Sequence, residues 1–267
     1  MALRIADFSR IVFFTGAGMS AESGVPTYRG KGGIWKEYDY ESCACQRAFD
    51  HDPEHVWEFH DYRRGLVGKC APNDGHRLVA RCEAVLPSVT VVTQNIDGLH
   101  QAAGSQRVLE LHGSLWKLRC DRCGWRGEDR SAPVEDHLCP VCKAAGTTTK
   151  LGTPVYKRPD IVWFGDNLRA DVIAEVREAL ATCDLLIAIG TSAVVYPAAD
   201  MPLIAKRAGA RLVEINPDDT PLSSIYETCM RTTATEGLAQ LCEGCRRSRR
   251  EPGSCSPPRA FCYRHLR

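Results

Sequence analysis

Residues 89–100 read VTVVTQNIDGLH, and this stretch decides the fold class of the chain. The β-branched run Val89–Val92 is typical of a buried strand, and a polar segment follows it directly. In open α/β sheets, ligands bind beyond the carboxyl ends of the strands, so Gln94, Asn95 and Asp97 are candidate ligand-binding residues. Taken alone, the segment fits a polar loop in which Asn and Asp make turns equally well.

A second strand-to-loop junction lies near the N-terminus. The run 10–14 leads into Gly16-Ala17-Gly18-Met19-Ser20-Ala21, which has the G-x-G-x-x-A form of a dinucleotide-binding turn. In such a turn the glycines let the backbone approach a pyrophosphate at a helix N-terminus. The acidic residue expected about twenty positions later cannot be assigned, because Glu37, Asp39 and Glu41 all lie near that place.

Two more junctions indicate the same kind of sheet. The apolar run Leu185–Ile189 ends in Gly190-Thr191-Ser192, and the run Arg211–Ile215 ends at Asn216. Apolar spacing from Val172 to Leu180 predicts a helix before the first run, and 197–208 predicts a crossover helix between them. The chain is therefore predicted to be an α/β protein with a Rossmann-like parallel sheet and helices on both faces.

The cysteines give the strongest local signal. Cys120-x-x-Cys123 and Cys139-x-x-Cys142 are separated by 15 residues, which matches two knuckles that offer four thiolates to one tetrahedral Zn²⁺. Four thiolates leave no open position for water, so the predicted ion is structural. Disulfides are the alternative, but the chain has 14 cysteines, several of them in predicted core segments.

The remaining cysteines are weaker candidates. Cys242-x-x-Cys245, with Cys255 and Cys262, falls in a tail rich in Arg, Pro and Ser that predicts a solvated, disordered segment over 242–267. A single CxxC pair is a weak metal signal, and Cys43-Ala44-Cys45 is weaker still.

Composition limits the possible classes of protein. The chain has 267 residues, 44% of them hydrophobic, and a net charge of +1, so no global basic field argues for nucleic acid. No apolar run approaches the roughly 20 residues that cross a bilayer. Residues 1–7 are too short before the first predicted strand to be a secretory or transit peptide, and free thiols suit a reducing compartment. We expect a monomeric cytoplasmic protein that binds no membrane.

Several motifs, in this order, carry a resemblance to a known family: GAGMSAESGVPTYRG from Gly16, TQNIDGLH from Thr93, LHGSLWKLRC from Leu111, the two CxxC pairs, IVWFGDNL from Ile161 and GTSAVVYPAA from Gly190. Over roughly residues 5–241 the chain resembles the sirtuins, NAD-dependent protein-lysine deacylases. Within them it is similar to the class III branch, whose members remove malonyl, succinyl and glutaryl groups.

The resemblance implies a discontinuous catalytic domain over 1–241. The Rossmann-like part would use residues 1–30, 75–115 and 158–241. A smaller inserted domain would combine residues 31–74, a cofactor loop followed by helices, with the zinc segment 116–157. Substrate would enter the cleft between them.

The resemblance also implies a mechanism. The acyl oxygen of an acyl-lysine protein or peptide displaces nicotinamide from NAD and gives an O-alkylimidate. His112 acts as general base on the ribose hydroxyls, a step that suits an imidazole because its ordinary pKa lies near working pH. The products are free lysine and O-acyl-ADP-ribose.

By position, the family's cofactor contacts fall on three groups of residues. Asn95 and Asp97 would hold the ribose and the nicotinamide amide, and Gln94 would orient the ribose. Tyr28 departs from the phenylalanine that the family usually has. The full expected set is Gly16, Ala17, Gly18, Ser20, Thr27, Tyr28, Arg29, Gln94, Asn95, Ile96, Asp97, Gly190, Thr191, Ser192 and Asn216.

The expected substrate contacts divide into two sets. Val162, Trp163, Phe164 and Gly165 resemble a strand that pairs with the substrate backbone, with Phe164 as a wall of the acyl-lysine tunnel. The class III pattern for an acidic acyl group has Ala, then Tyr and Arg three residues apart.

Ala44 and Arg63 match this class III pattern, but His60 stands at the Tyr position. Arg63 favours a carboxylate, His60 offers one hydrogen bond, and a protonated His60 would strengthen binding as the pH falls.

Three functions stay open at this point. Plain deacetylation is the alternative to acidic deacylation, since Arg63 can also be read as a helix-surface charge. Mono-ADP-ribosyl transfer would use the same cofactor site with a different acceptor. A zinc-ribbon binding module without catalysis is the third, and the presence of Asn95, Asp97 and His112 argues against it.

Overall fold

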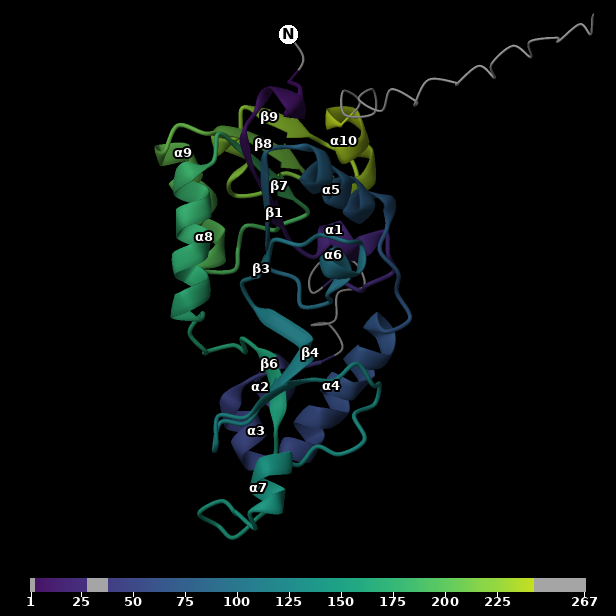
Figure 1. Ribbon diagram of the computed structural model, residues 1–267, viewed down its shortest axis with the longest axis vertical. Coiled ribbons are helices and arrows are strands. Elements are labelled where there is room, and N and C mark those ends of the chain that lie inside the picture. Colours follow the sequence, from purple (N-terminus) through teal and green to yellow (C-terminus); the bar gives the residue numbers. More distant parts are fainter. Residues whose placement is uncertain (1–2, 28–37, 243–267) are drawn as a thin grey trace, which may run out of the picture.

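The computed structural model describes residues 3–27 and 38–242. Figure 1 shows an elongated molecule with a large sheet and its helices in the upper part and a smaller sheet with helices in the lower part. The predicted cofactor residues Tyr28 and Arg29 and the predicted disordered tail after Cys242 lie outside the described residues.

The large sheet has six strands in the order β3-β2-β1-β7-β8-β9, and every neighbouring pair is parallel. Its strands are β1 (Arg10–Thr15), β2 (Ser88–Thr93), β3 (Val108–Glu110), β7 (Leu185–Ile189), β8 (Arg211–Ile215) and β9 (Thr228–Met230). This confirms the predicted α/β class. The chain runs outward from β1 in both directions, so the carboxyl ends of β1 and β7 mark the crevice where such sheets bind ligands.

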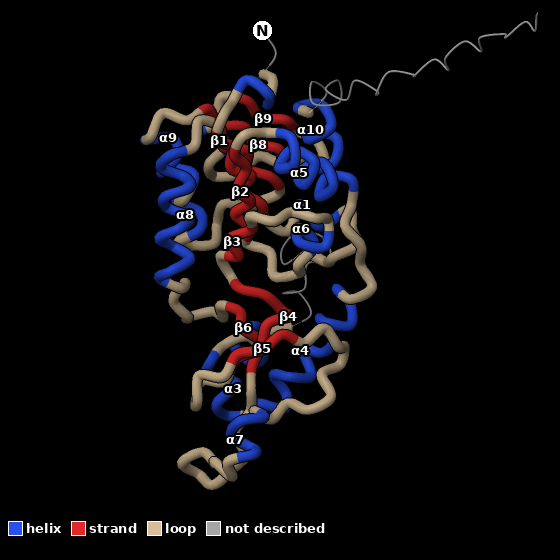
Figure 2. The backbone as a smooth tube through the Cα atoms, viewed as in Figure 1, coloured by secondary structure: helices blue, strands red, loops and turns tan. Residues whose placement is uncertain are grey.

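Helices cover both faces of this sheet. On one face α5 (Asp74–Val85) and α10 (Ala234–Leu241) pack on Phe13 and Val91, and on the other α8 (Ala170–Thr182) and α9 (Pro202–Arg207) pack on Phe14 and Leu186. Figure 2 shows these pairs on opposite sides of the strands. Burial on two faces explains the continuously apolar strands, since adjacent residues point to opposite sides.

The crossover helix predicted over 197–208 is shorter than expected. A 3₁₀ turn, η3 (Ala198–Asp200), precedes α9, and Pro202 begins the helix because a proline is tolerated in the first helical turn. The other short turns are η1 (Ile5–Asp7), η4 (Ser223–Ile225), α1 (Gly18–Ala21) and α6 (Leu99–Ala102).

The smaller sheet has the order β5-β4-β6 and is antiparallel. It contains β4 (Gly113–Arg119), β5 (Arg126–Glu128) and β6 (Arg158–Ile161), with α2 (Tyr40–Cys43), α3 (Gln46–His51), α4 (Pro53–Val67) and α7 (Pro140–Ala144) around it. The sheet therefore pairs residues from both sides of the predicted limit at 157/158. The exact domain limits stay a prediction.

Trp57, Leu115 and Trp163 belong to the apolar core of this lower part. Within the described residues, no helix has the length and apolar character needed to cross a membrane.

Candidate active site and metal centre

One cavity of about 650 Å³ collects most of the predicted site residues. It lies between the carboxyl ends of β1, β2, β7 and β8 and the residues of α4 and the segment after β6. The predicted residues that line it are Gly16, Ala17, Gly18, Thr27, Ala44, His60, Arg63, Gln94, Asn95, Ile96, His112, Val162, Trp163, Phe164, Gly165, Gly190, Thr191, Ser192 and Asn216. Gly16 and Asn216, 200 positions apart in the chain, therefore share one concave surface.

The glycine turn packs against a second glycine turn. The Gly18 N–H donates to the Gly190 carbonyl at 2.9 Å, and a Cβ on Gly18 would lie 2.6 Å from Gly190 Cα. Gly190 itself has φ +57, and a Cβ there would lie 2.5 Å from the backbone of Gly18. Glycine is needed at both positions so that the loops after β1 and β7 can touch, and their contact shapes the floor of the cavity.

Asn95 and Asp97 form hydrogen bonds with residues of the glycine turn. Asn95 Nδ2 donates to the Gly16 carbonyl at 3.0 Å, and the Ser20 hydroxyl donates to Asp97 Oδ2 at 2.7 Å. Burial raises the pKa of Asp97 above its ordinary value of 3.8, and hydrogen bonds from Leu99 N and Ser20 act in the opposite direction. Ser20 and Asp97 are both buried and do not line the cavity; they hold the turn and Asn95 in place.

His112 is fixed in one tautomer. Its Nδ1 lies 2.9 Å from the Gln94 carbonyl oxygen, which can only accept, so Nδ1 carries the hydrogen and Nε2 keeps its lone pair. Burial lowers the pKa of His112 below 6.5, although the bond to Gln94 raises it in part. The imidazole is therefore neutral at neutral pH, with a basic nitrogen available on a residue that lines the cavity.

Gln94 also connects the strand ends. Its side-chain Nε2 donates to Thr191 Oγ1 at 2.9 Å, and Asn216 Nδ2 donates to the Thr191 carbonyl at 2.8 Å. The loops after β2, β7 and β8 are thus joined by side-chain hydrogen bonds across the open edge of the sheet.

The far end of the cavity carries His60 and Arg63. They are one helical turn apart on α4, so they share a face, and they are 1% and 4% exposed. Such burial excludes the reading of Arg63 as a helix-surface charge. Ala44, at the end of α2, is 5% exposed and lines the same cavity.

Trp163 contacts His60 directly. The indole N–H donates to His60 Nε2 at 3.0 Å, and the Arg158 guanidinium carbon lies 3.3 Å from the centroid of the Trp163 ring. Burial lowers the pKa of His60 well below 6.5, and the positive charges of Arg63, Arg158 and Arg64 lower it further. Both effects disfavour a protonated His60 near neutral pH, so they do not support the expectation that protonation strengthens binding in that range.

Residues 162–165 do not form the expected strand in this structure. The strand β6 ends at Ile161, and a turn follows in which the Asp166 N–H donates to the Trp163 carbonyl at 3.0 Å. Gly165 has φ +87, a value that ends extended pairing. Phe164 is 38% exposed and lines the cavity mouth, where its N–H donates to the Ala44 carbonyl at 3.1 Å.

Some lining residues were not predicted. Asp218 and Thr220 follow Asn216 beyond β8, and Val195 and Tyr196 follow the Gly190 loop. Asn216 was predicted because ligands bind beyond the carboxyl ends of strands. The same reason applies to Asp218, two residues later, which the prediction did not include. Thr233 comes from the start of α10, and no local signal identifies it.

A buried histidine pair beneath the cavity was also missed. His76 and His100 have ring centroids 4.8 Å apart, and His76 Nε2 lies 3.5 Å from the Ser20 hydroxyl. Burial lowers the pKa of His76 to about 4 and that of His100 to about 3. The capping position Asn73-x-x-His76 was the one available sequence signal.

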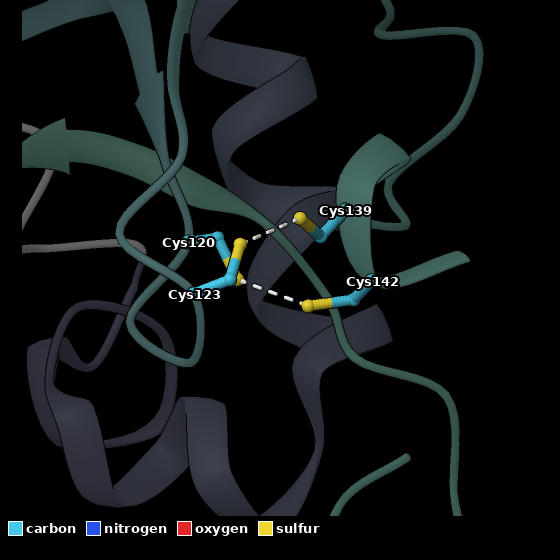
Figure 3. Close-up of side chains that lie close together, drawn as sticks. All are labelled: Cys120, Cys123, Cys139 and Cys142. Carbon is cyan, nitrogen blue, oxygen red and sulfur yellow. Dashed lines mark hydrogen bonds between the residues drawn. The ribbon is translucent and has the colours of Figure 1, made fainter. Parts of the chain in front are cut away.

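The four predicted metal ligands come together at the other end of the small sheet (Figure 3). All four Sγ atoms lie within 4.8 Å of one another, with Cys120 to Cys142 at 3.9 Å and Cys123 to Cys139 at 3.6 Å. Tetrahedral Zn–S bonds of about 2.3 Å place the sulfurs about 3.8 Å apart, so the quartet suits one zinc ion and not two disulfides.

No cysteine of this quartet lines the cavity in the described part of the chain, which suits a structural role. It is also the one cluster of potential metal ligands found among the described residues.

Comparison with known proteins gives a consistent result. The model of the Sir2 family matches residues 16–197. A protein named NAD-dependent protein deacylase from Aquifex aeolicus is 41% identical over 231 residues, which cover 86% of this chain and 93% of the relative. The dog protein named NAD-dependent protein deacylase sirtuin-5, mitochondrial, is 39% identical over 259 residues, covering 88% of this chain and 82% of that protein.

Solved structures agree with this result. A Sir2 homologue in complex with NAD superposes with a TM-score of 0.80 at 41% identity and covers 91% of this chain and 92% of that chain. A Sir2 variant with a deacetylated p53 peptide and 3'-O-acetyl ADP ribose has a TM-score of 0.75 at 33% identity, over 89% and 94% of the two chains. The matched family model spans the glycine turn, His112 and all four cysteines, and the chain belongs to the Sir2 family.

Proposed function

We propose that this protein is an NAD-dependent protein-lysine deacylase that favours acidic acyl groups. The observation that carries the proposal is His112, whose Nδ1–H is held by the Gln94 carbonyl so that a neutral Nε2 serves a cavity ending at Arg63. The relatives named NAD-dependent protein deacylase support the reaction class.

The residues of this chain fit NAD. Gly16, Gly18 and Gly190 line the cavity without side chains, so a pyrophosphate could approach their backbone, and the amide of Asn95 lies beside them. Bound NAD would supply an electrophilic ribose carbon and nicotinamide as the leaving group. His112 Nε2 is unprotonated at neutral pH and takes the proton of a ribose hydroxyl, while Gln94 holds the ring orientation through its carbonyl.

The four-thiolate cluster takes no part in this chemistry. A closed sulfur site has no position for water, and the cysteines lie outside the cavity lining. Its expected role is to hold β4 and β6 together, since Cys120 follows β4 directly and Val155, just before β6, packs on the quartet.

Protein lysines are the proposed substrate. A solved relative holds a deacetylated peptide. In this chain the exposed Phe164, Val194 and Tyr196 offer an apolar rim on which a peptide backbone can lie. Free thiols beside a thiolate cluster support a reducing location such as the cytoplasm.

The acyl preference rests on charge at the end of the cavity. Arg63 is 4% exposed on the same helix face as His60, and a carboxylate there would gain a charge-assisted hydrogen bond. An acetyl group carries no charge and cannot make this charge-assisted bond, so it gains less from this end of the cavity. Succinyl, malonyl and glutaryl groups therefore suit this cavity better than acetyl.

The test compares one peptide carrying acetyl, malonyl, succinyl or glutaryl lysine in an assay of nicotinamide release. We expect a higher kcat/KM for the acidic acyl groups, and we expect Arg63→Met to lower the succinyl-to-acetyl ratio by roughly two to three orders of magnitude, because removing one partner of a buried pair costs about 3–5 kcal/mol. Arg47→Met, an exposed arginine on α3, is the matched control and should leave the ratio unchanged.

Other results would select other functions. Equal losses for both peptides in Arg63→Met would favour plain deacetylation. Release of nicotinamide with ADP-ribose attached to protein and no free lysine would favour mono-ADP-ribosyl transfer.

A further inference from the structure

His60 stands where the class III pattern has a hydroxyl donor, and its two ring nitrogens have different surroundings. Nε2 accepts the Trp163 indole N–H at 3.0 Å. Nδ1 is buried and has no hydrogen-bond partner among the described residues. A buried polar atom without a partner is uncommon and marks either a cost to stability or a place for a ligand.

The indole decides which nitrogen of His60 carries the hydrogen. An indole N–H can only donate, so Nε2 must be the acceptor, and the proton of a neutral ring must then sit on Nδ1. His60 lines the cavity together with Arg63. Its one donor is thus the atom that still lacks a partner.

Trp163 is itself held firmly. It is 3% exposed, its ring centroid lies 5.3 Å from that of Phe49, and the Arg158 guanidinium covers one face at 3.3 Å. Arg158 is fixed in turn by an ion pair with Asp166 at 3.0 Å. A cation over an indole face makes a favourable contact, so the ring cannot easily turn its N–H away from His60.

The charges around His60 are positive. Arg63 and Arg64 come from the same helix α4, and Arg158 comes from β6. Arg64 is paired with Asp129, and Arg158 with Asp166 and Asp121. On the α2 side, burial raises the pKa of the Cys43 thiol to about 11, so that group adds no negative charge. Among the residues that the structure describes, the groups that shift the pKa of His60 include three positive charges and no carboxylate.

We propose that Trp163 is a positioning residue for acyl selectivity: its indole N–H keeps Nε2 of His60 as an acceptor, so that His60 presents Nδ1–H, as a neutral donor, to the carboxylate of an acidic acyl group. This inference rests on the acidic-deacylase function proposed above. His60 then replaces a phenol hydroxyl with an N–H donor, and Trp163 is the residue that keeps the hydrogen on Nδ1.

The first test reads the tautomer without any activity measurement. In protein labelled with ¹⁵N on histidine, the ring nitrogens of His60, assigned by their absence in His60→Gln, should show the Nδ1–H form from about pH 6 to about pH 8. Trp163→Phe keeps an aromatic face for Arg158 but removes the donor, so His60 should become a mixture of tautomers. An Nε2–H form, or titration of His60 in this range in the unaltered protein, would overturn the proposal.

The second test reads selectivity. Trp163→Phe should lower the ratio of kcat/KM for succinyl to that for acetyl peptide by about twofold to tenfold, the range expected for one neutral hydrogen bond.

The matched control is Trp57→Phe. Trp57 is fully buried in the same apolar cluster and on the same helix as His60, and its N–H donates to the Lys157 carbonyl at 2.8 Å. It loses an equivalent hydrogen bond away from the cavity, so its ratio should not change. Equal changes in the two variants would mean that Trp163 acts only on stability.

The two proposals fail in different ways. An unaltered protein with no preference for succinyl over acetyl would contradict the acidic-deacylase function and remove the positioning role with it, even if the spectra show the Nδ1–H form. A succinyl preference with the wrong tautomer would leave the function intact and overturn only the role of Trp163.

Discussion

The two ends of the cavity are built in different ways. The cofactor half, made of Gly16, Gly18, Gln94, Asn95 and Gly190, consists of residues that directly follow parallel strands. The acyl half, made of Ala44, His60, Arg63, Trp163 and Phe164, comes from helix ends, one helix face and a turn after β6. The first is a property of a sheet edge, and the second is a property of packing between segments far apart in the chain.

This difference predicts different sensitivities. In the cofactor half, glycines and backbone groups form the surface of the cavity, so added side-chain atoms should have the largest effect on NAD binding. In the acyl half, buried polar and charged side chains form the site. Trp125 packs on the apolar core of this part and also on the cysteine quartet, so it connects the two. Four experiments test this comparison: loss of the zinc ion, loss of the general base His112, substitution of Gly190, and a decrease in pH.

The largest effect is expected from loss of the metal. Cys142→Ser should abolish stoichiometric zinc and loosen the acyl half first, because structural zinc contributes on the order of 10–16 kcal/mol in small zinc-binding peptides. Metal analysis and hydrogen exchange should show lost protection in β4, β6 and α4 but not in β1 and β7. Cys183→Ser, a buried cysteine beneath the large sheet, should keep its zinc. One zinc retained in Cys142→Ser would mean that the ligand set is wrong.

Loss of the base comes next. His112→Ala should lower turnover roughly 10²–10⁴-fold while NAD still binds, because Nε2 removes a proton but does not anchor the cofactor turn. In the unaltered protein, turnover should decrease with pH only below pH 6.5, since burial lowers the pKa of His112. Steady-state kinetics and calorimetry with NAD check this result, with the half-exposed His55→Ala as control. Near-normal turnover would contradict the assignment.

Two glycine substitutions distinguish backbone strain from loss of the contact between the two glycine turns. Gly190→Ala should cost about 1–3 kcal/mol and raise the KM for NAD, because the new Cβ meets Gly18 at 2.5 Å. Gly209→Ala is the matched control, since Gly209 also has positive φ, +83, but no atom within 4 Å of the new Cβ. Both should lose stability to backbone strain, and only the first should affect NAD. Equal KM values would show that the contact between the turns does not shape the site.

The smallest effect is expected from acid. The pKa of His100 falls to about 3 on folding, so between that value and 6.5 the unfolded chain binds more protons and stability decreases as the pH falls. From pH 7 to pH 5 this amounts to about 1–2 kcal/mol for one histidine.

His100→Gln should flatten that part of the dependence in urea titrations, and the difference between the two proteins cancels the opposite contribution of Asp97, whose pKa is raised. An unchanged slope would mean that His100 is not the buried neutral group. Acid should thus weaken the part beneath the cofactor half, as metal loss weakens the acyl half.

Local patterns predicted the four central strands β1, β2, β7 and β8 because these are buried on both faces, but they missed the short edge strands β3 and β9, which are only partly buried. The run Leu185–Ile189 is apolar throughout and coincides with β7. Strand β8, Arg211–Ile215, contains the buried Glu214, which accepts hydrogen bonds from Thr220 and Ser223 and pairs with Arg231. The cysteine quartet was predictable for a similar reason, because its chemistry is set by spacing. The turn at 162–165 was not, because its shape depends on Asp166 and on the contact with Ala44.

By itself, the sequence determined the α/β class, the order of the strand-end loops, the zinc ligands and the likeness to the sirtuins, since all of these follow from local periodicity, spacing and motifs. Only the tertiary structure decided that His112 donates to the Gln94 carbonyl, that two glycine turns touch, and that His60 is neutral beside Trp163. These are relations between groups far apart in the chain. Burial and neighbouring charge set them, and no local pattern of residues encodes either.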